Sequence, residues 1–303
     1  MPSLSVLLCT RNRGEKIRNA VDSILGNTFT DFELLVVDQS TDGKTLDVMV
    51  TYRDPRIRYM HTDTVGLSRS RNIAIRSSKA EIIVFTDDDC ICDTGWLAAI
   101  TGEYNSDPTI MGVYGRVLPY GKEPEGMICH CLIDSPERRT VNSAVIPYEI
   151  LGHGNNMSFR KEVFRRVGLY IESLGAGTWM KGGEDTDLVY RALRARMKLA
   201  YSPNPLVYHD NWMPISKAAE LEYGYILSAI AVFVKYALRL DYEAFKHILE
   251  RLNEILKRIY YHLKRGNKNE LELAFVRLRW FLIGIIMGIK YFFVATPKFK
   301  ERL

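Results

Sequence analysis

The chain has 303 residues, of which 47% are hydrophobic and 25% are charged, and it contains no internal repeat or low-complexity tract. This composition excludes a disordered chain and is typical of a globular protein with room for one large domain and an appendage. The charge is uneven: residues 1–212 carry 25 Lys and Arg against 27 Asp and Glu, whereas residues 213–303 carry 16 against 9. The basic tail predicts an acidic partner, and we expect anionic lipid rather than nucleic acid.

The N-terminal residues and the cysteines indicate a cytoplasmic setting. The apolar run after Met1 lasts only to Cys9, which is too short for a secretory leader. Five cysteines, an odd number, favour reduced thiols. Cys90–Cys92 and Cys129–Cys131 form two CxC pairs, which leave a zinc site open as an alternative, although CxxC is the usual spacing.

The first half of the chain alternates between apolar runs of strand length and helical patterns. Residues 4–9 and 32–37 are predicted strands, and the helix expected between them ends near Gly26. Strand, helix and strand in this order predict a right-handed crossover and a parallel sheet. Further elements are expected at residues 46–52 (helix), 56–60 (strand), 68–77 (helix) and 82–86 (strand).

Polar residues follow the predicted strands, so they should meet at the carboxyl-terminal edge of the sheet, where ligands bind in open α/β folds. They are Thr10, Arg11, Asp38 and the run Asp87, Asp88 and Asp89. Three adjacent carboxylates repel one another unless a cation lies between them, and oxygen ligands of this kind suit Mg²⁺ or Mn²⁺. We expect Asp87 and Asp89 to point one way and Asp88 the other. A solvated acidic turn is the alternative.

Two further features lie in the middle of the chain. Residues 118–150 are expected to be irregular, and a loop of that length favours a lid or an acceptor surface. Glu184, Asp185 and Asp187 open a predicted helix. Acids in a first helical turn are favoured by the helix dipole, but a carboxylate aimed into a cleft would also suit a general base. His209 ends the second of two short predicted strands, either as an ordinary polar residue or as a further metal ligand.

No GxGxxG follows the first strand and no GxxxxGK[ST] occurs, which weakens dinucleotide-dehydrogenase and P-loop interpretations. The motifs that do occur, in this order, resemble those of the family-2 glycosyltransferases over residues 1–212. They are Thr10-Arg-Asn-Arg, Val37-Asp-x-Ser-x-Asp, Gly66-Leu-Ser-x-x-Arg-Asn, Thr86-Asp-Asp-Asp, Gly154-Asn-Asn-Met-Ser-Phe and Gly183-Glu-Asp-x-Asp-Leu.

The resemblance implies an α/β fold of the GT-A type, with a mainly parallel, Rossmann-like sheet followed by an all-α region. It implies that Asp38 contacts the nucleotide base and that Arg71 and Asn72 line the nucleotide and diphosphate, beside Thr10 and Arg11. The run from Asp87 to Asp89 matches the DxD motif, whose first acid lies near the ribose and sugar and whose last acid holds Mn²⁺ or Mg²⁺.

The implied chemistry is a single, inverting sugar transfer. Asp185, in the pair with Glu184, matches the general base, and His209 resembles a metal ligand found in some members. We expect a UDP-sugar as donor, although Asp38 suits guanine or thymine as well. Gln39 departs from the small polar residue usual in the motif. No QxxRW motif is present, so we expect no polymer synthesis.

Two hypotheses from other classes stay open. One is a non-catalytic nucleotide-sugar or glycan-binding partner of a membrane assembly. Intact Asp89 and Asp185 favour an enzyme over it. The other is a phosphohydrolase with an aspartyl nucleophile, which the sequence after Asp87 does not favour because it lacks the expected hydroxyl residue.

Residues 213–303 read as long helices, expected at 218–240, 242–263 and 271–295. The uncharged run between Arg279 and Lys290 is only ten residues long, fewer than the roughly 20 needed to span a bilayer. A helix lying in the interface fits better, and packing between the subunits of a homo-oligomer is the rival explanation. We therefore divide the chain into a glycosyltransferase domain (1–212) and a membrane- or subunit-associating region (213–303). The expected location is the inner face of the cell membrane, with a glycan or lipid-linked acceptor.

Overall fold

The computed structural model describes residues 1–143, 147, 151 and 153–295. Its strands are β1 (Leu4–Thr10), β2 (Phe32–Asp38), β3 (Ile57–His61), β4 (Ile82–Asp87), β5 (Cys90–Cys92), β6 (Ile110–Pro119), β7 (Met127–Cys129), β8 (Arg139–Val141), β9 (Asn156–Arg160), β10 (Lys198–His209) and β11 (Trp212–Pro214). Its helices are a short 3₁₀ turn (Gly14–Lys16), α1 (Ile17–Leu25), α2 (Lys44–Met49), α3 (Leu67–Ser77), α4 (Trp96–Ser106), α5 (Lys161–Val167), α6 (Glu184–Arg194), α7 (Ile215–Ala237), α8 (Tyr242–Arg265) and α9 (Lys268–Ala295).

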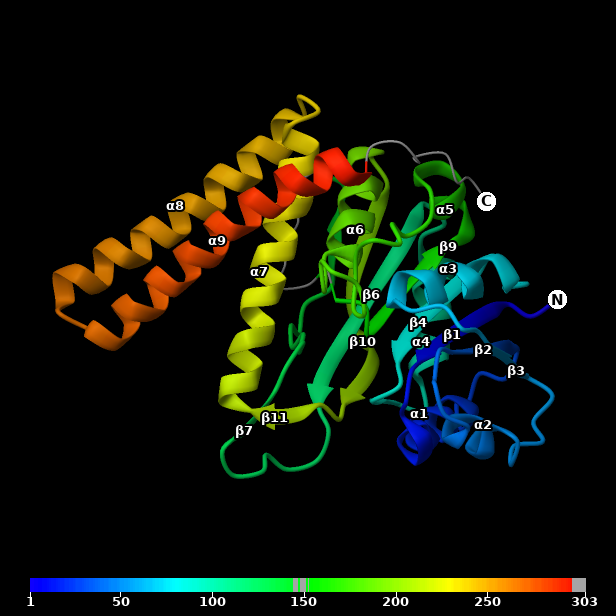
Figure 1. Cartoon of the computed structure of the whole chain (residues 1–303). Helices are drawn as coiled ribbons and strands as arrows, with labels where there is room; N and C mark the ends of the chain where they lie inside the picture. Colours follow the sequence, from blue (N-terminus) through cyan, green and yellow to red (C-terminus); the bar gives the residue numbers. More distant parts are fainter. Residues whose placement is uncertain (144–146, 148–150, 152, 296–303) are drawn as a thin grey trace.

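A mixed sheet in the order β3-β2-β1-β4-β9-β6-β10-β5 forms the centre of the molecule (Figure 1). The first four strands in this order are parallel. In this register Thr10 lies beside Asp38 and Cys9 beside Asp87, so β1, β2 and β4 end at one edge. The predicted parallel sheet and its polar edge are therefore confirmed.

The second half of the sheet differs in detail from the expectation. β9, which we did not predict, runs antiparallel between β4 and β6. β10 is one strand rather than two, with a register shift between Tyr201 and Leu206. β5, which we did not predict, returns directly from the acidic run and pairs with the end of β10. The pairing of β5 with β10 thus places residue 89 next to residue 209.

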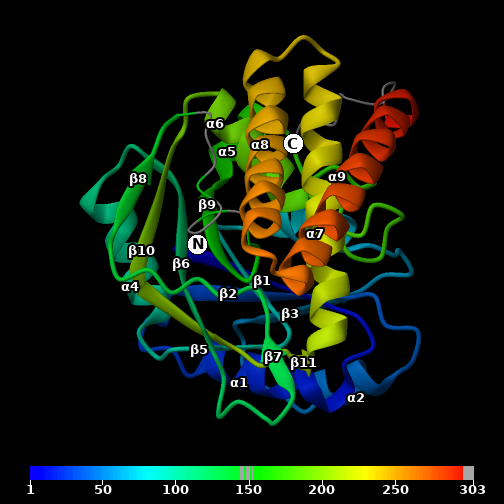
Figure 2. The ribbon, with the colours of Figure 1, turned by 90° about the vertical axis from the view of Figure 1, so that its left-hand side faces the viewer.

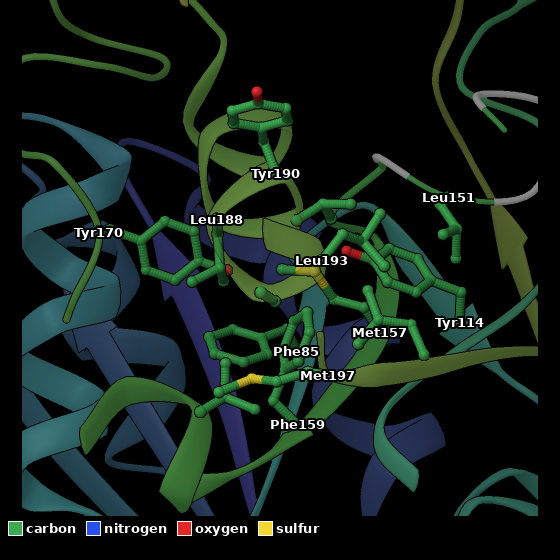
Figure 3. Packing of buried hydrophobic residues seen from close by; sticks show 14 of the residues in the cluster. Phe85, Tyr114, Leu151, Met157, Phe159, Tyr170, Leu188, Tyr190, Leu193 and Met197 are labelled. Atoms are coloured by element: carbon green, nitrogen blue, oxygen red, sulfur yellow. The ribbon is translucent and has the colours of Figure 1, made fainter. Parts of the chain in front are cut away.

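Alternation along the strands gives the sheet a hydrophobic core on each face. Leu4, Val6 and Leu8 of β1 pack with helices α1, α2 and α4. On the opposite face, side chains of β4, β6 and β9 pack with α3, α5 and α6, and Figure 3 shows Leu188 and Leu193 of α6 lying over Phe85 and Phe159. This packing fixes the first turn of α6 at the edge where the parallel strands end.

The three predicted C-terminal helices are confirmed as α7, α8 and α9, which pack on one another beside the sheet (Figures 1 and 2). Phe233 of α7, Ile248 of α8 and Phe281 of α9 belong to the same hydrophobic cluster as Phe85. The boundary at residue 212 stays a prediction, because the helices share this core with the sheet. Within the described part of the chain, no helix combines the length and hydropathy needed to cross a bilayer.

Candidate active site

A cavity of about 760 Å³ lies at the carboxyl-terminal edge of the parallel strands. Its walls include the ends of β1 and β4, the start of α6, and one face of each of α7, α8 and α9. Nine of the eleven site residues predicted from the sequence line it. They are Thr10, Arg11, Arg71, Asp87, Asp88, Asp89, Glu184, Asp185 and His209.

The acidic run after β4 is balanced by arginines. Arg13 lies with Nε 2.8 Å from Asp88 Oδ1 and with Nη2 3.0 Å from Asp89 Oδ2. The expectation that Asp88 points away from Asp89 is wrong here, because β4 ends at Asp87 and the next two residues form a turn without strand alternation. Burial raises the pKa of Asp88 to about 7 against the lowering effect of Arg13. The site therefore holds more buried negative charge than one arginine neutralises.

His209 faces the same acids from β10. Its Nδ1 donates to the backbone oxygen of His130 at 2.7 Å, which leaves Nε2 3.3 Å from Asp89 Oδ1. Burial lowers the pKa of His209, but the hydrogen bond to Asp89 outweighs it and the pKa rises to about 11. A place that stabilises a proton on Nε2 so strongly also suits a metal cation, and a backbone acceptor on the other nitrogen is the usual support for a metal-binding histidine.

One group of side chains in the site could hold a divalent metal ion. Asp89, Cys90 and His209 are the only group of three His, Cys, Asp or Glu side chains within metal-binding reach among the described residues. This group does not unite the two CxC pairs, whose members are free thiols, and Cys129 Sγ instead donates to the backbone oxygen of His209 at 3.3 Å. Carboxylate and imidazole ligands suit a hard or borderline divalent ion.

Arg71 of α3 joins the two acidic groups. Its Nη1 lies 2.7 Å from Asp185 Oδ1, and its Nη2 lies 3.7 Å from Asp87 Oδ1. The guanidinium is 3% exposed, so the pair with Asp185 is a buried ion pair. Gly154 packs against both partners, and a Cβ there would overlap the Arg71 guanidinium and the Asp185 carboxylate. The close approach explains why glycine stands at this position.

Glu184 holds its proton more tightly than a free glutamic acid. Burial raises the pKa of Glu184 to about 7, and the charge of Asp185 adds to the effect. Arg71 approaches it only to 3.9 Å. The first turn of α6 thus presents one carboxylate held by an arginine and one that keeps its proton near neutral pH.

Two predicted residues do not line the cavity. Asp38 is 1% exposed, with Oδ1 accepting from Ser40 and Oδ2 accepting from Tyr59 at 2.7 Å. Asn72 is also 1% exposed, and its amide exchanges two hydrogen bonds with the backbone of Tyr170, at 2.9 and 3.0 Å. These side chains order the loop after β2 and the packing of α3, and their roles toward a nucleotide stay predictions.

Asp187 ties the site to the C-terminal helices. Its carboxylate is fully buried and accepts from Arg191 at 2.7 Å, from Lys235 at 3.0 Å and from Tyr236 at 2.8 Å. Burial raises the pKa of Asp187, but Lys235 and Arg191 outweigh it and bring the pKa to about 2. Because Lys235 and Tyr236 belong to α7, the helix that carries Glu184 and Asp185 is held by an ion pair from outside the sheet.

The sequence reasoning missed several residues of the cavity wall. Arg13 was quoted only as part of a motif, although its spacing from Arg11 places it beside the strand end. Lys181 lies two residues before the acidic motif that begins at Gly183. The apolar residues at helical spacing on α8 predict only that one face of this helix is covered. The side chains that α8 and α9 turn to the cavity are Arg251, Glu254, Ile255, Arg258, Arg277 and Phe281.

The sequence model described as "Glycosyl transferase family 2" matches residues 5–168, more than half of the chain. The chain belongs to glycosyl transferase family 2. The predicted family is confirmed, and at this level a glycosyltransferase is supported and a phosphohydrolase is not.

Two curated relatives are 26% and 32% identical to the chain over the aligned residues. It is 26% identical over 216 residues to the pre-mycofactocin glycosyltransferase of Mycobacterium tuberculosis, which covers 69% of this chain and 43% of that protein. It is 32% identical over 122 residues to the poly(ribitol-phosphate) beta-N-acetylglucosaminyltransferase TarP of Staphylococcus aureus, covering 38% of this chain and 37% of TarP. The chain thus spans less than half the length of these curated relatives.

Solved structures confirm the GT-A fold. The mannosyltransferase PcManGT from Pyrobaculum calidifontis, in complex with GDP-Man and Mn²⁺, is 17% identical with a TM-score of 0.62, covering 97% of this family-2 chain and 88% of PcManGT. Residues 1–349 of S. aureus TarS, in complex with UDP-GlcNAc, are 18% identical with a TM-score of 0.59, covering 77% and 67%. The coverage of the first comparison extends the likeness into the helical region.

Proposed function

We propose that this protein transfers a single sugar, with inversion, from a nucleotide-diphosphate sugar to a hydroxyl of an acceptor. One observation carries the proposal: the acids after β4 and the acids opening α6 face one cavity, with Arg71 between Asp87 and Asp185. One group suits the diphosphate end of a donor and the other suits a general base. A solvated acidic turn would not need a second acidic group on the same cavity.

The donor half of the site would hold a divalent cation through Asp89, Asp87 and His209. When bound, such an ion supplies charge neutralisation for the departing diphosphate. Arg11 and Thr10 line the same half and can bind diphosphate oxygens. Structures of the two fold relatives contain GDP-Man with Mn²⁺ and UDP-GlcNAc. We propose a UDP-sugar as donor, with GDP as the first other nucleotide to test.

Asp185 is the proposed general base. Arg71 holds its carboxylate at 2.7 Å and fixes its direction, so the free oxygen can accept the proton of an acceptor hydroxyl. The acceptor oxygen then attacks the anomeric carbon on the side opposite the diphosphate. No second carboxylate is needed as a covalent nucleophile, and one displacement inverts the configuration.

The C-terminal helices also carry an exposed apolar surface, which we propose docks on anionic lipid. On α8 it comprises Phe245, Leu249, Leu256, Tyr260 and Leu263, and on α9 it comprises Phe275, Leu282, Ile286, Ile289 and Phe293. Ile286 is 66% and Phe293 is 73% exposed. The 16 Lys and Arg against 9 Asp and Glu of residues 213–303 complement an acidic membrane, which fits a lipid-linked or cell-surface glycan as acceptor at its cytoplasmic face.

The donor site is tested by calorimetry and thermal shift with UDP, GDP, dTDP and CMP, with and without Mn²⁺. We expect one nucleotide to bind in a metal-dependent way, and Asp89→Ala to lose that binding while Asp47→Ala, at an exposed position of α2, keeps it. No binding of any nucleotide with any metal would contradict the proposal. If the protein binds the nucleotide but never cleaves the nucleotide from the sugar of the donor, the alternative is favoured, namely a non-catalytic nucleotide-sugar-binding partner of a membrane assembly.

The membrane surface is tested by co-sedimentation with vesicles of phosphatidylcholine, with and without phosphatidylglycerol. The protein should bind only the anionic vesicles, and the variant Phe275→Ser/Ile286→Ser should lose most of this binding. Leu46→Ser, which removes a leucine that is 43% exposed on α2, serves as the control. The contrary outcome is that the protein does not bind the vesicles but forms a dimer, and that the double variant is monomeric. This result would show that the surface joins the subunits of a homo-oligomer.

A further inference from the structure

The helices α7, α8 and α9 form the wall of the cavity that lies beyond the acids of α6. Gly183, just before these acids, packs against Ser228 and Val232 of α7, so the cavity continues from Asp185 directly onto this helix. In the proposed reaction the acceptor approaches from the side of the base, opposite the diphosphate. The helical wall is therefore where the rest of an acceptor must lie, and this step rests on the proposed function.

One face of α8 is turned to this space. Arg251, Glu254, Ile255 and Arg258 follow the spacing i, i+3, i+4 and i+7, which places them in a single stripe. Ile255 is only 8% exposed and fixes which way the stripe faces. Arg251 and Arg258, on either side of it, line the cavity and stay open to solvent, Arg251 with 42% of its side chain exposed.

The charges on this wall are unequally paired. Arg251 lies 3.0 Å from Glu254, and Arg277 of α9 lies 3.0 Å from Glu222 of α7. These two pairs neutralise the acids of the wall. The side chains of Lys181 and Arg258 have no hydrogen-bond or ion-pair partner within residues 1–143, 147, 151 and 153–295, which leaves two cations of the cavity lining without a counter-charge.

The backbone at Lys181 adds a second, independent observation. Its φ is +58°, a left-handed conformation that a side chain with a Cβ rarely adopts. It stands directly before Gly182 and Gly183, in the loop that delivers the acids of α6. Strain of this kind persists when the surrounding structure imposes it, and it is concentrated at functional sites.

We propose that Lys181 and Arg258 form an anion subsite for the acceptor, and that the acceptor carries a phosphate ester near the hydroxyl that receives the sugar. A phosphate group has several oxygens that can accept hydrogen bonds from cations, and a guanidinium binds it with two parallel hydrogen bonds. The apolar side chains of Ile255 and Phe281 beside them can cover a carbon chain attached to the phosphate. The chemistry recognised is the phosphate ester, whether on a soluble molecule or on a lipid.

The test is calorimetric titration of glycerol 3-phosphate and of a short-chain lysophosphatidic acid below its micellar concentration. The protein is first saturated with Mn²⁺ and the nucleoside diphosphate that it binds, so that the donor half is filled. We expect Arg258→Gln to weaken phosphate binding about tenfold and Lys181→Gln/Arg258→Gln to abolish it. Lys257→Gln, the adjacent exposed cation of α8 outside the cavity, should bind like the unaltered protein, and glycerol should not bind.

Each outcome decides the proposal. Binding of both probes through Arg258 supports a phosphate subsite, and binding of the acylated probe alone through Arg258 supports it with a lipid as the source. No binding of either probe, or equal binding by Arg258→Gln, overturns it. If the protein binds no nucleoside diphosphate, the proposed function fails, yet the same titration without nucleotide still reports on Arg258 separately.

Discussion

The two walls of the cavity are built in different ways. The wall at the strand ends is made by short turns after β1 and β4, and its carboxylates outnumber their close cations, since Arg13 alone contacts both Asp88 and Asp89. The helical wall is made by residues far along the chain, and the side chains of Lys181 and Arg258 beside it lack a counter-charge among the described residues. A wall with excess negative charge suits a ligand that brings a cation. A wall with excess positive charge suits a ligand that brings an anion.

The largest expected effect concerns the residue where the two walls meet. Asp185→Asn should reduce release of the nucleotide from its sugar by about 10²–10⁴-fold, because Asn keeps the size and the contact with Arg71 but cannot accept a proton. Nucleotide binding by calorimetry should persist. Asp47→Asn is the control, and an Asp185→Asn protein with near-normal turnover would remove Asp185 from the role of base.

The next effect concerns the ion pair that holds α6 to α7 of the helical wall. Lys235→Met should lower the free energy of unfolding by about 3 kcal/mol at pH 7, since it removes one partner of the fully buried Asp187. The contribution of Asp187 is present above pH 4 and disappears as the pH falls toward its folded pKa of about 2. The deficit of the variant in urea unfolding should therefore shrink between pH 4 and pH 2.

Lys257→Met is the control for that comparison, since Lys257 is exposed on α8 and should change stability by less than about 0.5 kcal/mol. A Lys235→Met protein as stable as this control would mean that the pair with Asp187 does not hold α6 to α7.

A smaller effect on stability is expected at Gly154, whose backbone lies against the ion pair of Arg71 and Asp185. Gly154→Ala should cost about 1–3 kcal/mol of stability, because the added methyl group displaces the Arg71 and Asp185 side chains. Gly102→Ala in α4 has open space around its Cβ and should stabilise the protein by up to about 1 kcal/mol. Thermal unfolding of both proteins makes the comparison, and equal melting temperatures would contradict the close contact at Gly154.

The smallest effect is a pH dependence at Glu184. Its raised pKa means that the native state binds its proton more tightly than the unfolded state, so the protein loses stability as the pH rises from about 4.5 to about 7. Asp185 and Asp87 raise this pKa together with burial, and Arg71 opposes them. Glu184→Gln removes the penalty and should stabilise the protein by about 1–2 kcal/mol at pH 8 but little at pH 5. A stabilisation that does not grow with pH would exclude a protonated Glu184.

The strand-end wall could be predicted because its signals are local. Asp87, Asp88 and Asp89 follow an apolar run, and parallel strands bring such ends together whatever the rest of the chain does. Asp38 and Asn72 show the limit of this reasoning. The motif places them near the edge, but hydrogen bonds from Tyr59 and to the backbone at Tyr170, which no sequence spacing reveals, turn their side chains into the fold.

The helical wall could not be predicted, although its helices were. An amphipathic stripe predicts that one face of a helix is covered, but it does not indicate what covers that face. The position of Ile255 in the stripe is equally consistent with packing between helices, and only the tertiary arrangement shows that Arg258 lines a cavity. The single long β10 was missed for a related reason, because Pro203 and Pro205 interrupt the apolar pattern while the strand bulges past them.

The ion pair between Asp187 and Lys235 also has a consequence for the order in which the chain folds during synthesis. When α6 leaves the ribosome, the carboxylate at its core lacks a partner that is translated 48 residues later. Until α7 emerges, Asp187 pairs with Arg191 alone and lacks the hydrogen bonds from Lys235 and Tyr236, so the first turn of α6 is not yet fixed in its final place. A nascent chain that can already pair its strands would therefore acquire a complete catalytic edge only late, after most of the protein has been made.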